Sequence, residues 1–170
     1  MKNRTKKVAN AVIVTLLCLT FLLTGCKKEE YRTDVDTKDL AARLSEKMPT
    51  ESAWINEDQG FIEEYVAIPE SVKASHVYYA QNTNDLDEFG VFWVEDGQAK
   101  AVRNMLAQDY LQKRYNENRE WYDSYMPAET PKLRDAEVRV YGNCVAYAVL
   151  SQENRKAFFE ECEKLLKNPE

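Results

Sequence analysis

Histidine, glycine and proline are scarce in this chain of 170 residues, which contains one His, five Gly and five Pro. A single His argues against His-based metal sites and against His-centred catalytic triads. The shortage of Gly and Pro excludes collagen-like and low-complexity chains. An excess of basic residues is also lacking: the formal net charge is −6, which argues against a nucleic-acid binder. The length suits a single domain.

The first 26 residues have the composition of an export signal. Four basic residues lie within positions 2–7, and an uncharged apolar stretch follows over positions 11–23. This stretch is shorter than the roughly 20 residues of a comfortable membrane span, but it fits the apolar part of a secretory signal. The motif that ends the segment is Leu23, Thr24, Gly25 and Cys26.

This motif resembles the lipobox of bacterial lipoproteins. In that family the Cys thiol receives a diacylglyceryl group, the preceding peptide is removed, and the new amino end is usually acylated, for example with palmitate. The resemblance implies a signal peptide over 1–25, a lipidated tether over 26–33 and a single domain over 34–168. It also implies an exported protein on the outer face of the cell membrane. The alternative is an uncleaved anchor helix in which Cys26 is incidental.

Removal of the leader would take away four basic residues and no acidic residue, so the mature chain would have a net charge of −10. An acidic domain is repelled by an anionic lipid surface. We therefore expect the lipid on Cys26, and not the domain surface, to provide the membrane attachment.

Hydrophobic periodicity in the mature chain predicts an α+β domain. The order α-(α)-ββ-α-ββ-α suggests an antiparallel sheet of about four strands in two hairpins, with helices mainly on one face. The stretch around Trp54 is expected to be irregular, and the short segment 61–66 to be helical or extended. The remaining expected elements are helices over 37–48, 98–122 and 151–167, and strands over 75–81, 88–95, 136–141 and 144–150.

Two of these strands, 88–95 and 144–150, are apolar on both faces. The sheet face away from the main helices is therefore expected to carry aromatic surface. Either the N-terminal segment with Trp54 and Phe61 covers this surface, or the surface forms a groove for a partner. The residues proposed for such a partner face are Val91, Trp93, Val145 and Tyr147.

Several short patterns are similar to a family of bacterial lipoproteins known as domain of unknown function 4358. They are the lipobox, the acidic pair Asp87-Glu88, the helix end Tyr125-Met126-Pro127 and the strand start Gly142-Asn143-Cys144-Val145. The similarity covers about 34–166, and Cys144 departs from it where an aromatic residue is usual. It implies export, lipidation and an α+β fold, and it brings no catalytic or ligand-binding residue.

Cys144 and Cys162 are the two cysteines left in the mature domain besides the lipidated one. In an exported, oxidising setting they are candidates for a disulfide. A final helix that folds back on the last strand would bring them to similar heights, and the bridge would close a loop of about 18 residues worth ~3 kcal/mol. The alternative is a pair of buried free thiols.

Other polar groups could serve in catalysis or metal binding, but each also has a purely structural explanation. His76 could pair with Cys144 as a thiol dyad, but a lone His at a strand start is more often an edge residue. Asp36 or Thr37 suits the N-cap of the first helix. Side-chain oxygens at the first hairpin could bind calcium, although a solvated turn explains them better. That group comprises Asn82, Asn84, Asp85, Asp87 and Glu88.

No catalytic residue, metal ligand or cofactor is assigned from these patterns. The function expected is that of a membrane-anchored extracytoplasmic binding module, not an enzyme, with an envelope protein or the cell wall as its partner. The alternative is an extracytoplasmic hydrolase or a receptor for a small glycan or peptide. That alternative requires a concave pocket with clustered carboxylates or groups of perturbed pKa.

Overall fold

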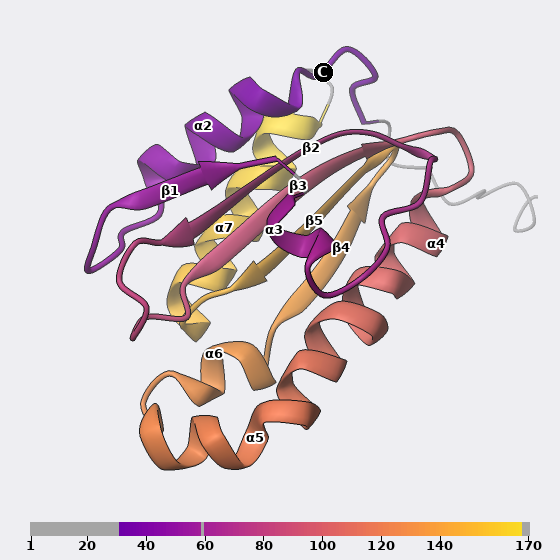
Figure 1. Cartoon of the computed structure of the whole chain (residues 1–170). Helices are drawn as coiled ribbons and strands as arrows, with labels where there is room; N and C mark the ends of the chain where they lie inside the picture. Colours follow the sequence, from indigo (N-terminus) through magenta and orange to yellow (C-terminus); the bar gives the residue numbers. More distant parts are fainter. Residues whose placement is uncertain (1–30, 59, 168–170) are drawn as a thin grey trace, which may run out of the picture.

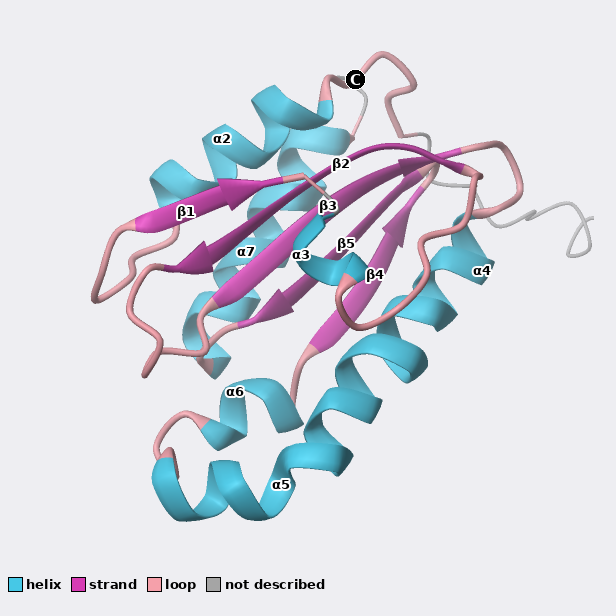
Figure 2. Ribbon diagram, in the orientation of Figure 1, coloured by secondary structure: helices cyan, strands magenta, loops and turns pink. Residues whose placement is uncertain are grey.

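A five-stranded antiparallel sheet forms the centre of the domain (Figures 1 and 2). The computed structural model describes residues 31–58 and 60–167. The strands lie in the order β1-β2-β3-β5-β4, so the two hairpins β2–β3 and β4–β5 are joined edge to edge through β3 and β5. The strands are β1 (Trp54–Glu57), β2 (Val72–Ala80), β3 (Glu88–Val94), β4 (Glu137–Tyr141) and β5 (Cys144–Val149).

Helices cover both faces of this sheet. On one face lie α2 (Thr37–Lys47) and α7 (Gln152–Leu166), and on the other lie α4 (Ala99–Asn104), η1 (Met105–Gln112) and α5 (Lys113–Tyr125) (Figure 2). Two short helices, α3 (Gly60–Glu63) and α6 (Thr130–Arg134), complete the second layer. The prediction of helices mainly on one face is therefore wrong, because β3 and β5 are apolar on both faces and each face needs its own cover.

The sheet also contains one strand more than predicted. β1 pairs with β2, with Trp54 opposite Ala80, where the sequence suggested an irregular stretch. At the N-terminus of α2, the Asp36 side chain caps the helix by accepting hydrogen bonds from the backbone N–H groups of Lys38 and Asp39. The long helix expected over 98–122 is present as the continuous run α4–η1–α5, which includes a π-helical segment.

The lipobox Leu23–Cys26, the signal peptide 1–25 and the tether before Tyr31 lie outside the described residues. Within the described part of the chain, no helix has the length and apolar character needed to cross a membrane.

The proposed partner face does not exist as one surface. Val91 lies opposite Ala146 and faces the α2–α7 layer, whereas Val145 and Tyr147 face the α4–α6 layer. All three side chains are fully buried, and Trp93 is half-buried against the α2–α7 side. Cross-strand neighbours share a face, so the register of β3 against β5 separates these residues. Two helical layers, rather than the Trp54 and Phe61 segment alone, provide the cover.

Candidate binding site

A buried carboxylate connects the sheet to the long helix. Glu88 opens β3 and is almost completely buried. Its Oε1 accepts hydrogen bonds of 2.6 Å from the hydroxyl groups of Tyr110 and Tyr147, and its Oε2 accepts one of 2.7 Å from Arg114 Nη1. Because every charge in this cluster is matched inside the core, Glu88 fixes the position of the long helix on the sheet.

Local sequence explains how these groups meet. Gly90 lies opposite Tyr147, and a Cβ added to Gly90 would come within 2.4 Å of the Tyr147 ring. Glycine therefore leaves the space that lets this tyrosine lie across β3. Tyr110 and Arg114 lie four residues apart, so they share one side of the helix and reach Glu88 together.

The protonation states of this cluster are fixed by burial and charge. Burial raises the pKa of Tyr110 and of Tyr147 well above that of a free phenol, so both hydroxyls stay protonated. Burial alone would lower the pKa of Arg114, but the Glu88 carboxylate more than offsets this and raises it. The two phenols and the Arg114 guanidinium thus hold their protons across the physiological range, which favours a structural role over acid–base catalysis.

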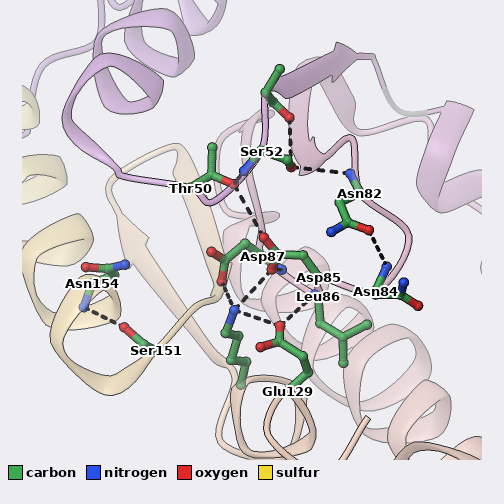
Figure 3. A network of polar contacts seen from close by, with 12 residues as sticks. Thr50, Ser52, Asn82, Asn84, Asp85, Leu86, Asp87, Glu129, Ser151 and Asn154 are labelled. Carbon is green, nitrogen blue, oxygen red and sulfur yellow. Dashed lines mark hydrogen bonds and ion pairs between the residues drawn. The ribbon is translucent and has the colours of Figure 1, made fainter. Parts of the chain in front are cut away.

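A second ionic cluster attaches α6 to the loop between β2 and β3 (Figure 3). Lys132 Nζ lies 3.0 Å from Asp85 Oδ1, 2.8 Å from Asp87 Oδ1 and 2.7 Å from Glu129 Oε2. Glu129 also accepts a hydrogen bond of 2.9 Å from the backbone N–H of Leu86. The loop carboxylates considered for calcium are therefore engaged with a lysine, and Glu88 points into the core.

The two aspartates of this cluster differ in their electrostatics. Burial raises the pKa of Asp87, and the attraction of Lys132 only partly opposes this. Burial would also raise the pKa of Asp85, but the backbone N–H of Asp87 and the Lys132 ammonium together lower it. A single cation thus serves three carboxylates, and α6 depends on it for its place in the fold.

The surface of α5 carries an exposed aromatic pair. Trp121 is 51% exposed and Tyr125 is 73% exposed, and their ring centroids are 5.5 Å apart. Trp121 also makes an edge contact with the buried ring of Tyr122. Figure 1 shows that α5 and α6 lie at the end of the molecule opposite the start of the described chain. Neighbouring exposed rings of this kind are typical of surfaces that bind a partner.

A cavity of about 330 Å³ lies between the long helix, α6 and the start of β4. Its apolar walls come from Ala107, Leu111, Leu133 and Ala136. Its polar lining groups are Gln112, Tyr115, Asn116 and Arg134. The volume is at the lower end of the range of about 300–1,000 Å³ typical of small-ligand sites. No acidic side chain is among these eight lining residues, although the chain as a whole is acidic.

The two domain cysteines lie in the core between the sheet and the α2–α7 layer. Both thiols are free and buried, so the predicted disulfide is not formed and the alternative of two buried thiols describes the structure. Burial raises the pKa of Cys144 to about 12 and that of Cys162 well above its ordinary value. Such thiols are poor nucleophiles, since the thiolate is the reactive form.

His76 faces the α2 side of the sheet and is half-buried. Burial lowers its pKa, with smaller contributions from Asp36 and Lys38, and Cys144 is not among the groups that influence it. The structure therefore does not unite His76 and Cys144 as a dyad.

The groups that distinguish this region leave little trace in the sequence. No local pattern singles out Arg114 or Lys132, each of which pairs with a carboxylate that is distant in the sequence. One signal exists for Trp121, because it stands among the charged residues Arg119, Glu120 and Asp123. The pairing of Glu88 with Arg114, 26 positions apart, left no local pattern.

The family model described as Domain of unknown function (DUF4358) matches residues 56–150. The chain belongs to this family. The matched range contains both ionic clusters, the aromatic pair and the cavity, and it ends before α7. No curated protein and no solved structure matches the chain significantly.

Proposed function

We propose that this DUF4358 protein is a lipid-anchored, extracytoplasmic binding module that presents its α4–α6 layer to a partner. The observation that carries the proposal is the exposed pair Trp121 and Tyr125 on α5. The buried Glu88–Arg114 cluster holds this helix to the sheet, and the Lys132 cluster holds the neighbouring α6 to the loop between β2 and β3. A rigid support reduces the ordering cost of binding.

The position of Tyr31 supports this orientation. Tyr31 packs against the α2–α7 side of the sheet, with its ring centroid 5.5 Å from that of Tyr141. Cys26 precedes it by five residues, which can span about 18 Å at most. A lipid on Cys26 would hold the α2–α7 side near the bilayer and leave the α4–α6 layer facing away from it.

A receptor for a small ligand is the second candidate, and the cavity beside Arg134 favours it. The hydrolase alternative has less support, because the carboxylates of both ionic clusters are engaged with Arg114 and Lys132 rather than lining the cavity.

Membrane attachment can be tested by fractionating cells that express Cys26→Ala. We expect the variant to leave the membrane fraction, because it lacks the thiol that accepts the lipid. Cys18→Ala, in the same leader, is the matched control and should stay membrane-bound. Retention of Cys26→Ala in the membrane would show that the lipoprotein assignment is wrong.

Presentation of the α4–α6 layer can be tested by photo-crosslinking in intact cells. A benzophenone amino acid at position 121 should give a discrete adduct, since this side chain is exposed on the proposed surface. The same group at position 156, on the exposed side of α7, is the control. Equal labelling from both positions would argue against a binding surface on α5.

A further inference from the structure

Strand β4 is an edge strand of the sheet, and its outer backbone groups form no hydrogen bond with the residues that the structure describes. β4 and β5 are joined by the turn Gly142-Asn143, with Tyr141 opposite Cys144. In a hairpin with a two-residue turn, this flanking pair exchanges both of its hydrogen bonds, and every second residue repeats the pattern. Arg139 and Glu137 therefore bond to β5, whereas the backbone groups of Val138 and Val140 point outward.

Neighbouring hydrogen bonds agree with this alternation. The C=O of Asn143 accepts a bond of 2.9 Å from Val94 N–H, on the β3 side of β5, which is the direction opposite to β4. Within the described ranges 31–58 and 60–167, no hydrogen bond reaches the outer backbone groups of Val138 or Val140. The edge is also open at its side chains, since Val140 is 40% exposed.

The cavity continues the line of this edge. Ala136, the next residue of the outward-facing series, is part of the cavity wall. Its backbone N–H donates a hydrogen bond to the C=O of Leu133 at the end of α6, so the open edge begins at Val138. Across the cavity lie Leu111 and Gln112 of η1, which leaves a site bordered by a strand edge on one side and a helix on the other.

The polar groups around the cavity offer hydrogen-bond donors to an anionic group. The Arg134 guanidinium is held by Asp135 through Nε and Nη2, at 2.8 and 2.7 Å. This pairing orients the group and leaves Nη1 free of hydrogen bonds to other described residues. The side-chain amides of Gln112 and Asn116 likewise form no hydrogen bond with the described part of the chain. These groups can donate to a carboxylate.

We propose that this site binds the C-terminal end of an extended peptide, which adds to β4 as an antiparallel strand. An antiparallel peptide beside β4 runs from Val140 toward Ala136, so its C-terminus arrives at the cavity. Its last apolar side chain fills the cavity, and its terminal carboxylate faces Arg134, Gln112 and Asn116. Strand addition of this kind takes affinity from backbone hydrogen bonds and specificity from a side-chain pocket. The inference rests on the proposed binding function and names its ligand class.

The test uses a fluorescein-labelled hexapeptide pool that ends in leucine and is random elsewhere, prepared as the free acid and as the C-terminal amide. Anisotropy is measured with the full chain in detergent. We expect the free acid to bind at least about tenfold more tightly than the amide, and Arg134→Gln to remove that preference.

Two variants test the geometry. Val138→Pro deletes only an outward N–H, because the β5 ladder does not use it, and proline is tolerated on edge strands. Ala107→Trp fills the cavity. Each should weaken binding of the free acid about tenfold or more, whereas Ala101→Trp on the exposed side of α4 should not.

Equal binding of acid and amide, no binding of either, or full binding by Val138→Pro and Ala107→Trp would overturn the proposal. If circular dichroism shows that Val138→Pro is unfolded, Ala107→Trp and Arg134→Gln decide the outcome. The crosslinking experiment separates this proposal from the proposed binding function. If position 121 gives an adduct in cells but no peptide binds, the peptide ligand is wrong and the binding function is still supported.

Discussion

The two helical layers of this domain hold to the same sheet by different means. The α2–α7 layer packs through apolar side chains and two thiols, with Arg155 at its margin. The α4–α6 layer adds two buried ionic clusters, a π-helical segment, a cavity and exposed rings. Buried charges are costly unless they are fully paired, so they are weak contributors to stability for their own sake. Their concentration in one layer indicates that its geometry, more than its stability, is what they specify.

The family match follows the same division. It begins within β1, after α2, and covers the other four strands and the whole α4–α6 layer, and it stops before α7. The layer with the site is therefore the one that the family model describes.

Removal of the buried Glu88 carboxylate, which contacts the α4–α6 layer, should have the largest effect on stability. Glu88→Ala leaves the Arg114 charge and two tyrosine hydroxyls without their acceptor, and we expect a loss of about 3–5 kcal/mol in the free energy of unfolding. Urea denaturation measures it. The double variant Glu88→Ala with Arg114→Met removes both charges and should recover part of the loss. Equal losses in the two variants would mean that the unpaired arginine is not the cause.

Alkaline pH should weaken the apolar layer through Cys144. Its pKa is about 9 in the unfolded chain and about 12 in the fold. The unfolded chain therefore binds fewer protons above pH 9, and stability falls by about 1.4 kcal/mol per pH unit until pH approaches 12. Urea denaturation between pH 8 and 11 checks this against Cys144→Ala, which should show a shallower slope. Identical slopes would contradict the assignment.

Loss of the Lys132 charge on α6 should have an intermediate effect on stability. Lys132→Met leaves three carboxylates close together, and we expect a loss of about 2–3 kcal/mol at pH 7. Like charges raise the pKa of these carboxylates in the fold, so protonation favours the folded variant and the loss should shrink at pH 5. Thermal unfolding at both pH values measures it, with exposed Lys156→Met on α7 as the control. A loss that does not depend on pH would show that repulsion is not the cause.

Removal of the exposed rings should have the smallest effect on stability. Trp121→Ala with Tyr125→Ala should change the free energy of unfolding by less than about 0.5 kcal/mol for each substitution, since both side chains are largely in water. Phe158→Ala, in the core of the other layer, should cost about 3–5 kcal/mol. Urea denaturation compares them. A large loss from the α5 pair would show that the pair supports the fold and is not reserved for a partner.

The sequence predicted the parts of the fold that local patterns encode. Alternation identified the two hairpins, and of the two residues expected to cap the first helix, Asp36 and Thr37, the structure has Asp36 as the cap. β1 was missed because four residues around Ile55 give too short a pattern. The second helical layer was missed although its signal was present: a strand such as β3, apolar on both faces, requires two covers. The site itself depends on contacts between distant residues, such as Lys132 with Asp85 and Asp87, which no spacing reveals.

The π-helical segment η1 has a consequence for how this gene can vary. An α-helix turns by about 100° per residue, so residues spaced by four drift around its axis, and the wider turns of a π-helix oppose that drift. Val102, Leu106, Tyr110 and Arg114 follow this spacing through η1, and all four are buried. Loss of one codon within 107–109 would shorten the protein by a single residue. A regular α-helix lacking that residue would space these four positions by four, three and four residues, which keeps Arg114 on the same side of the helix. A single-residue deletion should therefore be tolerated better in this segment than in the regular α-helical turns of α5.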